Sequence, residues 1–263
     1  MLDLTIRPIS EDETFRAQDY IDHIAKPLGS LGKLEHIAAR LASIQDTLRP
    51  ELSPREHFVF AADHGISAEP VSKSPREVTH QVVHSMLRGG AGICFLCHQH
   101  DFRLHIVDVG VDYDFEEGLG IISHKINRGT RSFLHEAAMT KDEMEQALAV
   151  GITCVDQALE RGAKLLSFGE MGIGNTSASA LWMYYLTDLP LEECVGRGSG
   201  LDEAGVRRKL ELLRTATQHY TGDRSPLDVM RYFGGYELVA TVGAMLRSAE
   251  RGCAFLVDGF IMT

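Results

Sequence analysis

The sequence predicts an α/β fold: a Rossmann-like, mostly parallel sheet covered by helices, with a small helical subdomain from the N-terminal region. Two observations predict it. Short apolar runs alternate with longer segments of helical periodicity, which is typical of parallel strands joined by helices. The runs are also rich in Val, Ile, Leu and Phe throughout, as expected of strands that are buried on both faces.

Four apolar runs are the predicted strands, and each ends in an acidic residue near a glycine. In open α/β sheets the ligand crevice lies beyond the carboxyl ends of the strands, so we expect these acids near one edge of the sheet. A polar residue that merely closes a strand is the alternative for each of them. The strands cover residues 57–63, 104–111, 164–170 and 254–260, and the acids are Asp63, Asp108, Glu170 and Asp258.

The predicted helices are marked by capping boxes or by apolar periodicity. Two segments begin with a serine or threonine followed three residues later by glutamate, the pattern that caps a helix N-terminus. Two others show apolar spacing of three and four. The first fifty residues are also helical in pattern, with a break at residues 26–35. The capped helices start at Ser74 (with Glu77) and Thr140 (with Glu143), and the periodic ones cover residues 200–220 and 236–252.

The chain of 263 residues is long enough for one large domain or two smaller ones. We predict that residues 1–50 form the N-terminal helical part of a small domain. Residues 51–263 form the predicted α/β nucleotide-binding domain. The C-terminal part of the small domain is expected to be absent from this sequence.

Composition argues against several functional classes. The formal net charge of −11 disfavours non-specific nucleic-acid binding, which depends on a basic surface. No apolar run approaches the ~20 residues of a membrane span, and the N-terminus does not resemble a signal peptide, so the expected location is the cytoplasm. The five cysteines form an odd set, and we expect reduced thiols packed in the core.

The most distinctive segment, SFGEMGIGNTSASA at residues 167–180, leads from a predicted strand into an Ala-rich helix. Its glycines permit positive φ angles and close backbone approach, and the free N–H groups at such a helix start attract a phosphate or carboxylate. It matches neither the Walker loop nor G-x-G-x-x-G. A purely structural tight turn is the alternative. The candidate ligand-binding residues are Gly172, Gly174, Asn175 and Thr176.

A second glycine cluster, VGRGSG at residues 195–200, also leads into a helix. Lys209 lies about two turns into that helix and is a candidate phosphate partner, although a solvated basic face would explain it too. Gly198 and Gly200 are the candidate binding glycines. Two such loops together indicate a ligand with a phosphate and a neighbouring ribose, which is a nucleotide-sized substrate.

Asp63 and His64 follow the first predicted strand in the segment AADHGIS. They lack further ligands at the spacings typical of metal sites, so no metal site is predicted. Asp63 is instead a candidate for hydrogen bonding to a sugar or base.

Taken in chain order, these segments resemble one family, the nicotinate-nucleotide–dimethylbenzimidazole phosphoribosyltransferases of cobalamin lower-ligand assembly. Matching segments run from residue 26 to the last residues, and the most specific are GEMGIGNT (169–176) and GRGSGLD (196–202). The resemblance implies that nicotinate mononucleotide donates its phosphoribosyl group to 5,6-dimethylbenzimidazole, giving α-ribazole 5′-phosphate and nicotinate. It also implies a homodimer and the absence of any metal or organic cofactor.

The resemblance further implies roles for individual residues. Glu170 would lie by the ribose and the reacting centre, and Ser74 and Gln81 would border the benzimidazole pocket, with helix capping as the alternative for Ser74. The phosphate would meet Gly172, Gly174, Asn175 and Lys209. Four apolar residues either shape an adaptable pocket for the aromatic base or pack in the core: Met86, Leu87, Met171 and Met183.

One departure from the family concerns the general base. In the family the proposed base is a glutamate in a glycine-rich C-terminal segment, whereas this sequence ends at Thr263. Either the chain is truncated or it lacks the usual base, and Glu170 is the candidate replacement because a partly desolvated Glu has a raised pKa. We therefore expect nucleotide binding with slow or absent turnover.

Two alternatives come from other functional classes. A Rossmann dehydrogenase requires a glycine fingerprint after the first strand, where this sequence has DHGIS instead. A non-catalytic module that binds a nucleotide or a benzimidazole is the other. The sequence also leaves open which aromatic base is preferred.

Overall fold

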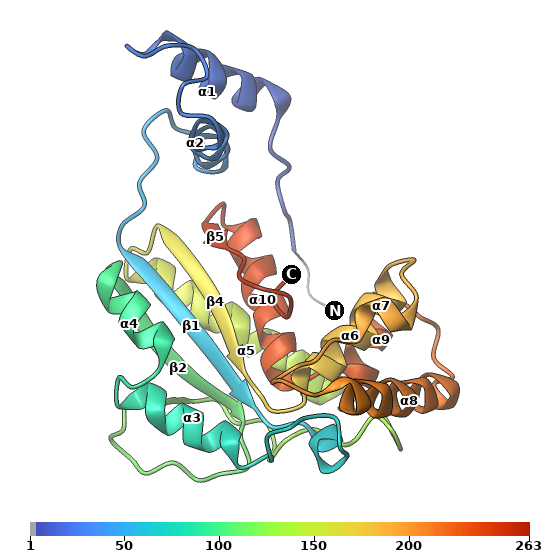
Figure 1. Cartoon of the computed structure of the whole chain (residues 1–263). Coiled ribbons are helices and arrows are strands. Elements are labelled where there is room, and N and C mark those ends of the chain that lie inside the picture. The colour runs from blue at the N-terminus through green and yellow to red at the C-terminus, as the bar shows by residue number, and fades with distance from the viewer. Residues whose placement is uncertain (1–3) are drawn as a thin grey trace.

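The computed structural model describes residues 4–263. Its centre is a sheet of five parallel strands in the order β3-β2-β1-β4-β5, which confirms the predicted α/β class. Figure 1 shows β1 between β2 and β4. The central strand β1 pairs with β2 on one side and β4 on the other. The strands are β1 (Arg55–Ala62), β2 (Phe102–Gly110), β3 (Ile122–Ser123), β4 (Leu165–Met171) and β5 (Ala254–Leu256).

Helices cover both faces of the sheet, as expected for strands without a polar face. Helices α5 and α10 lie on one face and helices α3 and α4 on the other (Figure 1). Phe58 and Phe60 of β1 pack in the main hydrophobic core, with α5 and α10. Val59 and Ala61 pack in a smaller core, with α3 and α4. The helices are α1 (Glu11–His23), α2 (Lys33–Ile44), α3 (Val78–Leu87), α4 (Gly92–Gln99), α5 (Lys141–Glu160), α6 (Asn175–Leu186), α7 (Leu191–Cys194), α8 (Glu203–His219), α9 (Pro226–Phe233) and α10 (Tyr236–Glu250).

The long predicted helices and three of the four predicted strands are confirmed. The Thr140–Glu143 capping box is present, with the Glu143 N–H donating to Thr140 Oγ1 at 3.1 Å. The predicted strand at 254–260 is too long, because the chain leaves the sheet after Leu256 and turns, with the Met262 N–H donating to the Gly259 carbonyl. Strand β3 was not predicted, since two residues carry no periodic signal.

The helix start predicted at Ser74 is wrong. Helix α3 begins at Val78, and no side chain caps its N-terminus. The residues before it form tight turns, with the Val78 N–H donating to the Pro75 carbonyl at 3.1 Å, and the Ser74 N–H is held by Ser72 Oγ at 3.2 Å. The Ser-x-x-Glu pattern therefore lies in an irregular segment that leads up to the helix.

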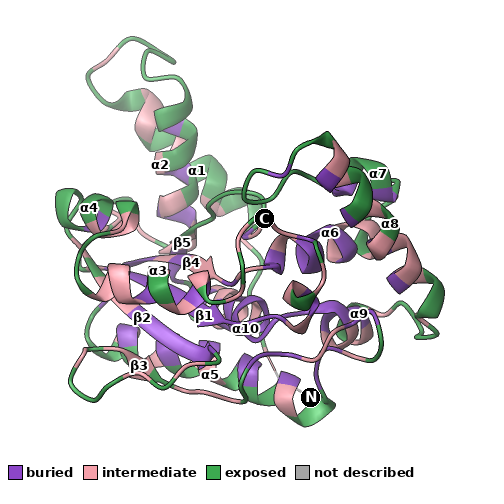
Figure 2. Cartoon of the chain, turned by 60° about the horizontal axis from the view of Figure 1, so that its bottom comes forward, coloured by how far each residue is buried: buried purple, intermediate pink, exposed green. Residues whose placement is uncertain are grey.

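Helices α1 and α2 form a hairpin that stands off the end of the sheet, and Figure 2 shows its surface as mostly exposed or intermediate. A small cluster of Ala17, Ala39 and Ala42 holds the two helices together. A break is present as predicted, but it covers residues 24–32 and not 26–35, because α2 already begins at Lys33. The division into residues 1–50 and 51–263 stays a prediction, and residues 1–3 lie outside the described part.

The strand order reverses between β1 and β4, and this is the point in an open α/β sheet where ligands bind. The loop after β4 lies directly on the end of β1 at this point. A Cβ atom on Gly172 would stand only 2.6 Å from the Ala62 carbonyl oxygen, so only glycine allows this approach.

Two further observations concern the helices and the cysteines. Within residues 4–263, no helix combines the length and apolar character that crossing a membrane requires. All five cysteines are free thiols, and each is buried except Cys94, which is partly exposed and donates to the Met86 carbonyl.

Candidate active site

A cavity of about 420 Å³ lies over the sheet beside the point where the strand order reverses. Its floor is formed by β1 and β4, its apolar wall by Met86 of α3 and Ile93 of α4, and its polar end by the second glycine loop. The segment after β5 closes the remaining side. The polar lining residues are His57, Glu170, Thr176 and Asp258.

Lys209, Thr176 and Gly198 lie close together: Thr176 and Gly198 line the polar end of the cavity, and Lys209 contacts Thr176 without lining the cavity itself. The Lys209 side chain is fully buried, and its Nζ donates to Thr176 Oγ1 at 2.8 Å. A Cβ on Gly198 would lie 3.1 Å from Thr176 Oγ1 and 3.7 Å from the ammonium. Burial lowers the pKa of Lys209 to about 8.

This ammonium has no carboxylate partner among residues 4–263. A buried charge without a counter-ion is unfavourable, so the arrangement indicates a site for an anion. The N-terminus of α6 adjoins it and has no side-chain cap. The Asn175 and Ser177 N–H groups donate to the Gly172 and Gly174 carbonyls, which leaves the Thr176 N–H for the same anion. By contrast, Asp202 already caps α8 by accepting from the Gly205 N–H at 2.7 Å.

Glu170, near the end of β4, faces the same cavity, and Asn175 Nδ2 donates to its Oε2. Burial and the nearby Glu237 carboxylate raise the pKa of Glu170 to about 7, against the lowering effect of Asn175 and His64. The raised pKa expected of this glutamate is therefore present. A carboxyl group that titrates near neutral pH is suited to proton transfer.

His64 and Glu237 form a buried pair behind Glu170 that the sequence did not predict. His64 Nε2 and Glu237 Oε1 are 2.5 Å apart, and both side chains are essentially inaccessible to solvent. Burial opposes the charge on His64, but the Glu237 carboxylate outweighs it, so the pKa of His64 is raised. His64 pairs with Glu237 and not with Asp63, its neighbour in the sequence.

His57 of β1 is a further lining residue that sequence reasoning missed. Its Nδ1 is 2.9 Å from Ser167 Oγ, and its Nε2 is buried without a hydrogen-bond partner. Burial lowers the pKa of His57 to about 4, although Asp258 raises it, so the imidazole is neutral at neutral pH. The sequence did not single out His57, because a histidine inside an apolar run has the pattern of a core residue.

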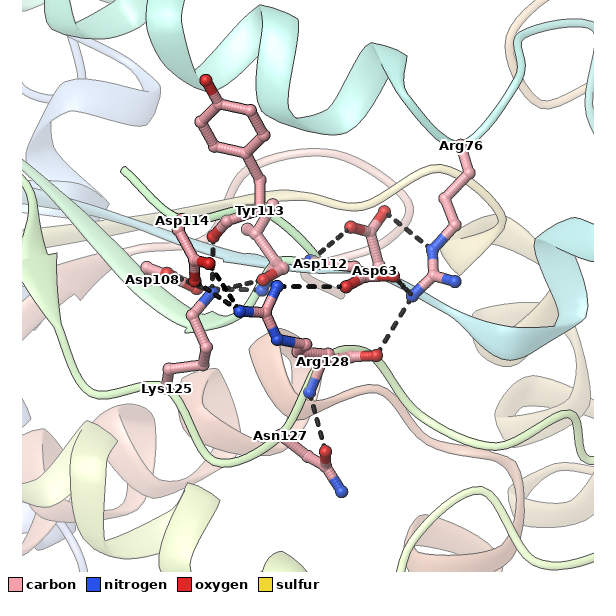
Figure 3. Close-up of polar contacts among 10 residues, drawn as sticks. Asp63, Arg76, Asp108, Asp112, Tyr113, Asp114, Lys125, Asn127 and Arg128 are labelled. Carbon is pink, nitrogen blue, oxygen red and sulfur yellow. Dashed lines mark hydrogen bonds and ion pairs between the residues drawn. The ribbon is translucent and has the colours of Figure 1, made fainter. Parts of the chain in front are cut away.

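Asp63 lies outside the cavity lining, in the polar cluster shown in Figure 3. Its Oδ2 accepts from the Asp112 N–H at 2.8 Å, and its Oδ1 is 3.7 Å from Arg76 Nε. Arg128 pairs with Asp112 and Asp114 in the same cluster. These contacts tie together the loops after β1 and β2, and contact of Asp63 with a sugar or base stays a prediction.

The Asp108 carboxylate is also held by contacts within the protein. Its Oδ1 accepts from the Gly110 and Val111 N–H groups, and its Oδ2 pairs with Lys125 at 2.8 Å. Of the four acids expected at the edge of the sheet, only Glu170 and Asp258 line the cavity.

The remaining predicted binding residues differ in their placement. Gly172 and Gly174 are buried against the loop after β1, and the Asn175 side chain is engaged by Glu170. Gly200, which has φ +105°, turns the chain before α8. Ser74 and Gln81 do not line the cavity, and Gln81 is exposed on α3.

Of the four apolar residues considered for the pocket, only Met86 lines the cavity. Leu87 and Met171 pack beside it against the smaller core, and Met183 packs against the main core.

We expect Gly174→Val to weaken nucleotide binding through backbone strain. Gly174 caps α6 with φ +101°, and a Cβ there would touch Ile66 at 3.3 Å. The left-handed conformation costs about 1–3 kcal/mol for a side-chain-bearing residue, so the start of α6 should shift. Calorimetry with nicotinate mononucleotide measures the affinity.

Gly162→Val is the matched control for this substitution. Gly162 also has positive φ, at +90°, but has open space around it at the far end of α5. Gly162→Val should lower the temperature of unfolding by a similar amount and leave the affinity for nicotinate mononucleotide unchanged. Equal affinities for wild type and Gly174→Val would remove the α6 N-terminus from the binding site.

Residues 4–263 contain no group of three or more His, Cys, Asp or Glu side chains arranged to hold a metal ion. The segment Cys94–His98 lies on α4, where Cys97 is buried and burial raises its thiol pKa to about 11. Thiols in this state pack as small apolar groups.

The chain is similar to known phosphoribosyltransferases over nearly its whole length. The sequence profile of the family described as "Phosphoribosyltransferase" matches residues 6–263. A protein of Parabacteroides distasonis named nicotinate-nucleotide–dimethylbenzimidazole phosphoribosyltransferase is 56% identical over 247 residues, covering 94% of this chain and 71% of the relative. A protein of the same name from Bacteroides fragilis is 53% identical, covering 96% and 74%.

The solved structures agree with the sequence comparison. The crystal structure of CobT from Thermus thermophilus superimposes with a TM-score of 0.89 at 40% identity, covering 95% of this chain and 75% of that one. The overall arrangement of sheet and helices is therefore shared with that protein.

Proposed function

Because the chain belongs to the nicotinate-nucleotide–dimethylbenzimidazole phosphoribosyltransferase family, we propose that it moves a phosphoribosyl group from nicotinate mononucleotide to 5,6-dimethylbenzimidazole. The products are α-ribazole 5′-phosphate and nicotinate. This is a glycosyl transfer at ribose C1′, and it needs a rigidly held phosphate, an aligned nucleophile and an acceptor for one proton.

The buried Lys209, which contacts Thr176 at the polar end of the cavity, supports the proposal most directly. Its ammonium and the hydroxyl and backbone N–H of Thr176 supply donors for the 5′-phosphate. Gly198 leaves room at this point because it has no side chain. A dianionic phosphate there supplies the counter-charge that the protein does not.

Glu170 is the proposed proton acceptor, since it is a cavity carboxylate with a pKa near neutrality. The oxocarbenium-like character of ribose in the transition state also favours a carboxylate nearby. The apolar wall with Met86 and Ile93 suits a flat aromatic nucleophile.

The test of this function is a turnover assay combined with calorimetry on the same preparation. Nicotinate mononucleotide and 5,6-dimethylbenzimidazole are supplied together, and formation of nicotinate and α-ribazole 5′-phosphate is followed by chromatography. We expect both products in equal amounts, formed slowly. Binding of either ligand without turnover would contradict the transferase and favour a non-catalytic binding module.

Two broader properties are part of the same proposal. We propose a homodimer, which gel filtration with light scattering tests. Cytoplasmic location is supported by the five free thiols, since reduced cysteines are typical of that compartment.

A further inference from the structure

The glycine loop after β4 is tied to α3 by a side chain that does not itself line the cavity. Thr79, in the first turn of α3, is fully buried, and its Oγ1 accepts from the Ile173 N–H at 3.2 Å. Ile173 stands between Gly172 and Gly174, in the loop that leads into α6. The contact therefore joins a helix on one face of the sheet to the loop before the proposed phosphate donors.

The Thr79 hydroxyl is used differently from those of other helical threonines in residues 4–263. Thr153 and Thr241, each inside a long helix, donate to carbonyls of the same helix at 2.8 and 2.9 Å. Such a bond stays local to the helix. Thr79 instead accepts from a residue 94 positions further along the chain. Its hydrogen bond fixes two separate elements against each other.

The N–H groups around the start of α6 have three different uses. Those of Asn175 and Ser177 donate to carbonyls of the loop itself. That of Thr176 is the proposed phosphate donor. That of Ile173 donates to Thr79, and this bond reaches outside the loop. The position of the phosphate donors relative to α3 therefore depends on the Thr79 hydroxyl.

The start of α3 is itself held in place. Arg76, two residues before the helix, donates from Nη2 to the Arg128 carbonyl at 3.1 Å and pairs with Asp112 at 3.4 Å (Figure 3). Further along α3, Val83 is buried in the smaller core against the sheet. Thr79 therefore offers the loop an acceptor whose position is fixed.

We propose that Thr79 is a positioning residue that keeps the phosphate donors of Thr176 aligned with the apolar wall of the cavity. The role rests on the proposed function. Thr79 and Met86 are seven residues apart on α3, about 10 Å along the helix axis and on the same side of it. One helix thus carries part of the wall for the aromatic acceptor and the hydroxyl that holds the nucleotide loop.

This alignment matters because the transfer joins two substrates at one atom. The phosphate site fixes one end of the nucleotide, and the wall on α3 orients the acceptor that attacks ribose C1′. Without the Thr79 hydroxyl the Ile173 N–H is left unpaired, which is costly, so the loop shifts to find another partner. The Thr176 donors then move relative to the Lys209 ammonium, while Val83 keeps the wall in place.

Calorimetry on Thr79→Val tests the role without requiring turnover, because valine keeps the shape of threonine and replaces the hydroxyl by a methyl group. The dissociation constant of nicotinate mononucleotide should rise about 5- to 10-fold, the equivalent of one hydrogen bond. That of 5,6-dimethylbenzimidazole alone should stay at the wild-type value, since α3 keeps its other contacts. Thr79→Ser retains the hydroxyl and should bind the nucleotide as the wild type does.

Thr241→Val is the matched control, because Thr241 is also buried and its hydroxyl donates within its own helix. This variant should bind the nucleotide with wild-type affinity. Equal nucleotide affinities in wild type and folded Thr79→Val would overturn the role. An equal loss in Thr79→Ser would overturn it too, since packing and not the hydroxyl would then be responsible.

Amide hydrogen exchange on the wild type covers the case of a variant that does not fold. The Ile173 N–H should be protected in the free protein, whereas the Thr176 N–H should gain protection only when nicotinate mononucleotide is added. An unprotected Ile173 N–H would overturn the role. If the wild type binds no nucleotide, the proposed function and this role fall together, whereas binding that is equal in wild type and Thr79→Val contradicts this role alone.

Discussion

Glu170→Gln should lower turnover by about 10²- to 10⁴-fold while leaving nucleotide affinity within a few-fold of the wild type. The amide keeps the shape of the side chain and its proximity to Asn175 but takes up no proton. The loss should therefore appear in kcat and not in the dissociation constant. Steady-state kinetics and calorimetry measure the two quantities separately.

The pH profile of the wild type gives a second check on Glu170. A base works in its ionised form, so kcat/KM should rise with pH and level off above about 7, because burial and Glu237 raise the pKa of Glu170 to about 7. The rise should be absent from the residual activity of Glu170→Gln. Glu193→Gln, on the exposed surface of α7, is the control and should behave as wild type. Retained turnover in Glu170→Gln would assign the base elsewhere.

Lys209→Ala should weaken binding of nicotinate mononucleotide by about 10- to 150-fold, which corresponds to the loss of about 1.5–3 kcal/mol for hydrogen bonding to a charged group. The ammonium is a cation buried beside Thr176, so water replaces it poorly. Lys209→Met keeps much of the packing and should lose a similar amount. Arg208→Ala, exposed on the same helix, is the control.

The affinity should also depend on pH in a defined direction. Because burial lowers the pKa of Lys209 to about 8, the free protein loses the ammonium charge as pH rises through that value. Affinity should hold below about 8 and decline above it, whereas Lys209→Met should show no such decline. Unchanged affinity in both variants would place the phosphate elsewhere.

The sheet and the long helices could be predicted from the sequence because their signals are local and repeated. The apolar runs of β1, β2 and β4 are long enough to be unambiguous, and the Thr140–Glu143 box stands directly before a periodic helix. The related pattern at Ser74 did not mark a helix start, since a side chain caps a helix only where the backbone already turns into one. Pattern alone does not report that geometry.

The candidate site was predicted in part. The pairing of two glycine loops brought Lys209, Thr176 and Gly198 together, but the sequence did not say which glycines face the cavity. Gly172 and Gly174 pack against protein and allow close approach of two loops, and their contact with a phosphate stays a prediction. Such a distinction depends on tertiary contacts that a single segment does not encode.

The pair of His64 and Glu237 was missed because its members are 173 residues apart in the chain. A signal was nevertheless present. Glu237 is a lone acid in the apolar helix YELVATVGAM, where a charge has no solvent to face, and His64 follows a strand end. A buried acid on such a helix requires a partner, which identifies the kind of residue to look for though not its position.

The strand order also has a consequence for how the protein folds. β1 is the innermost strand, yet one of its partners, β4, is made from residues 165–171, so the middle of the sheet forms only after a long loop closes. Such non-local pairing slows folding. During synthesis β1 and β2 pair first and leave one edge of β1 unpaired until β4 emerges, and this is the interval in which the chain is most open to aggregation.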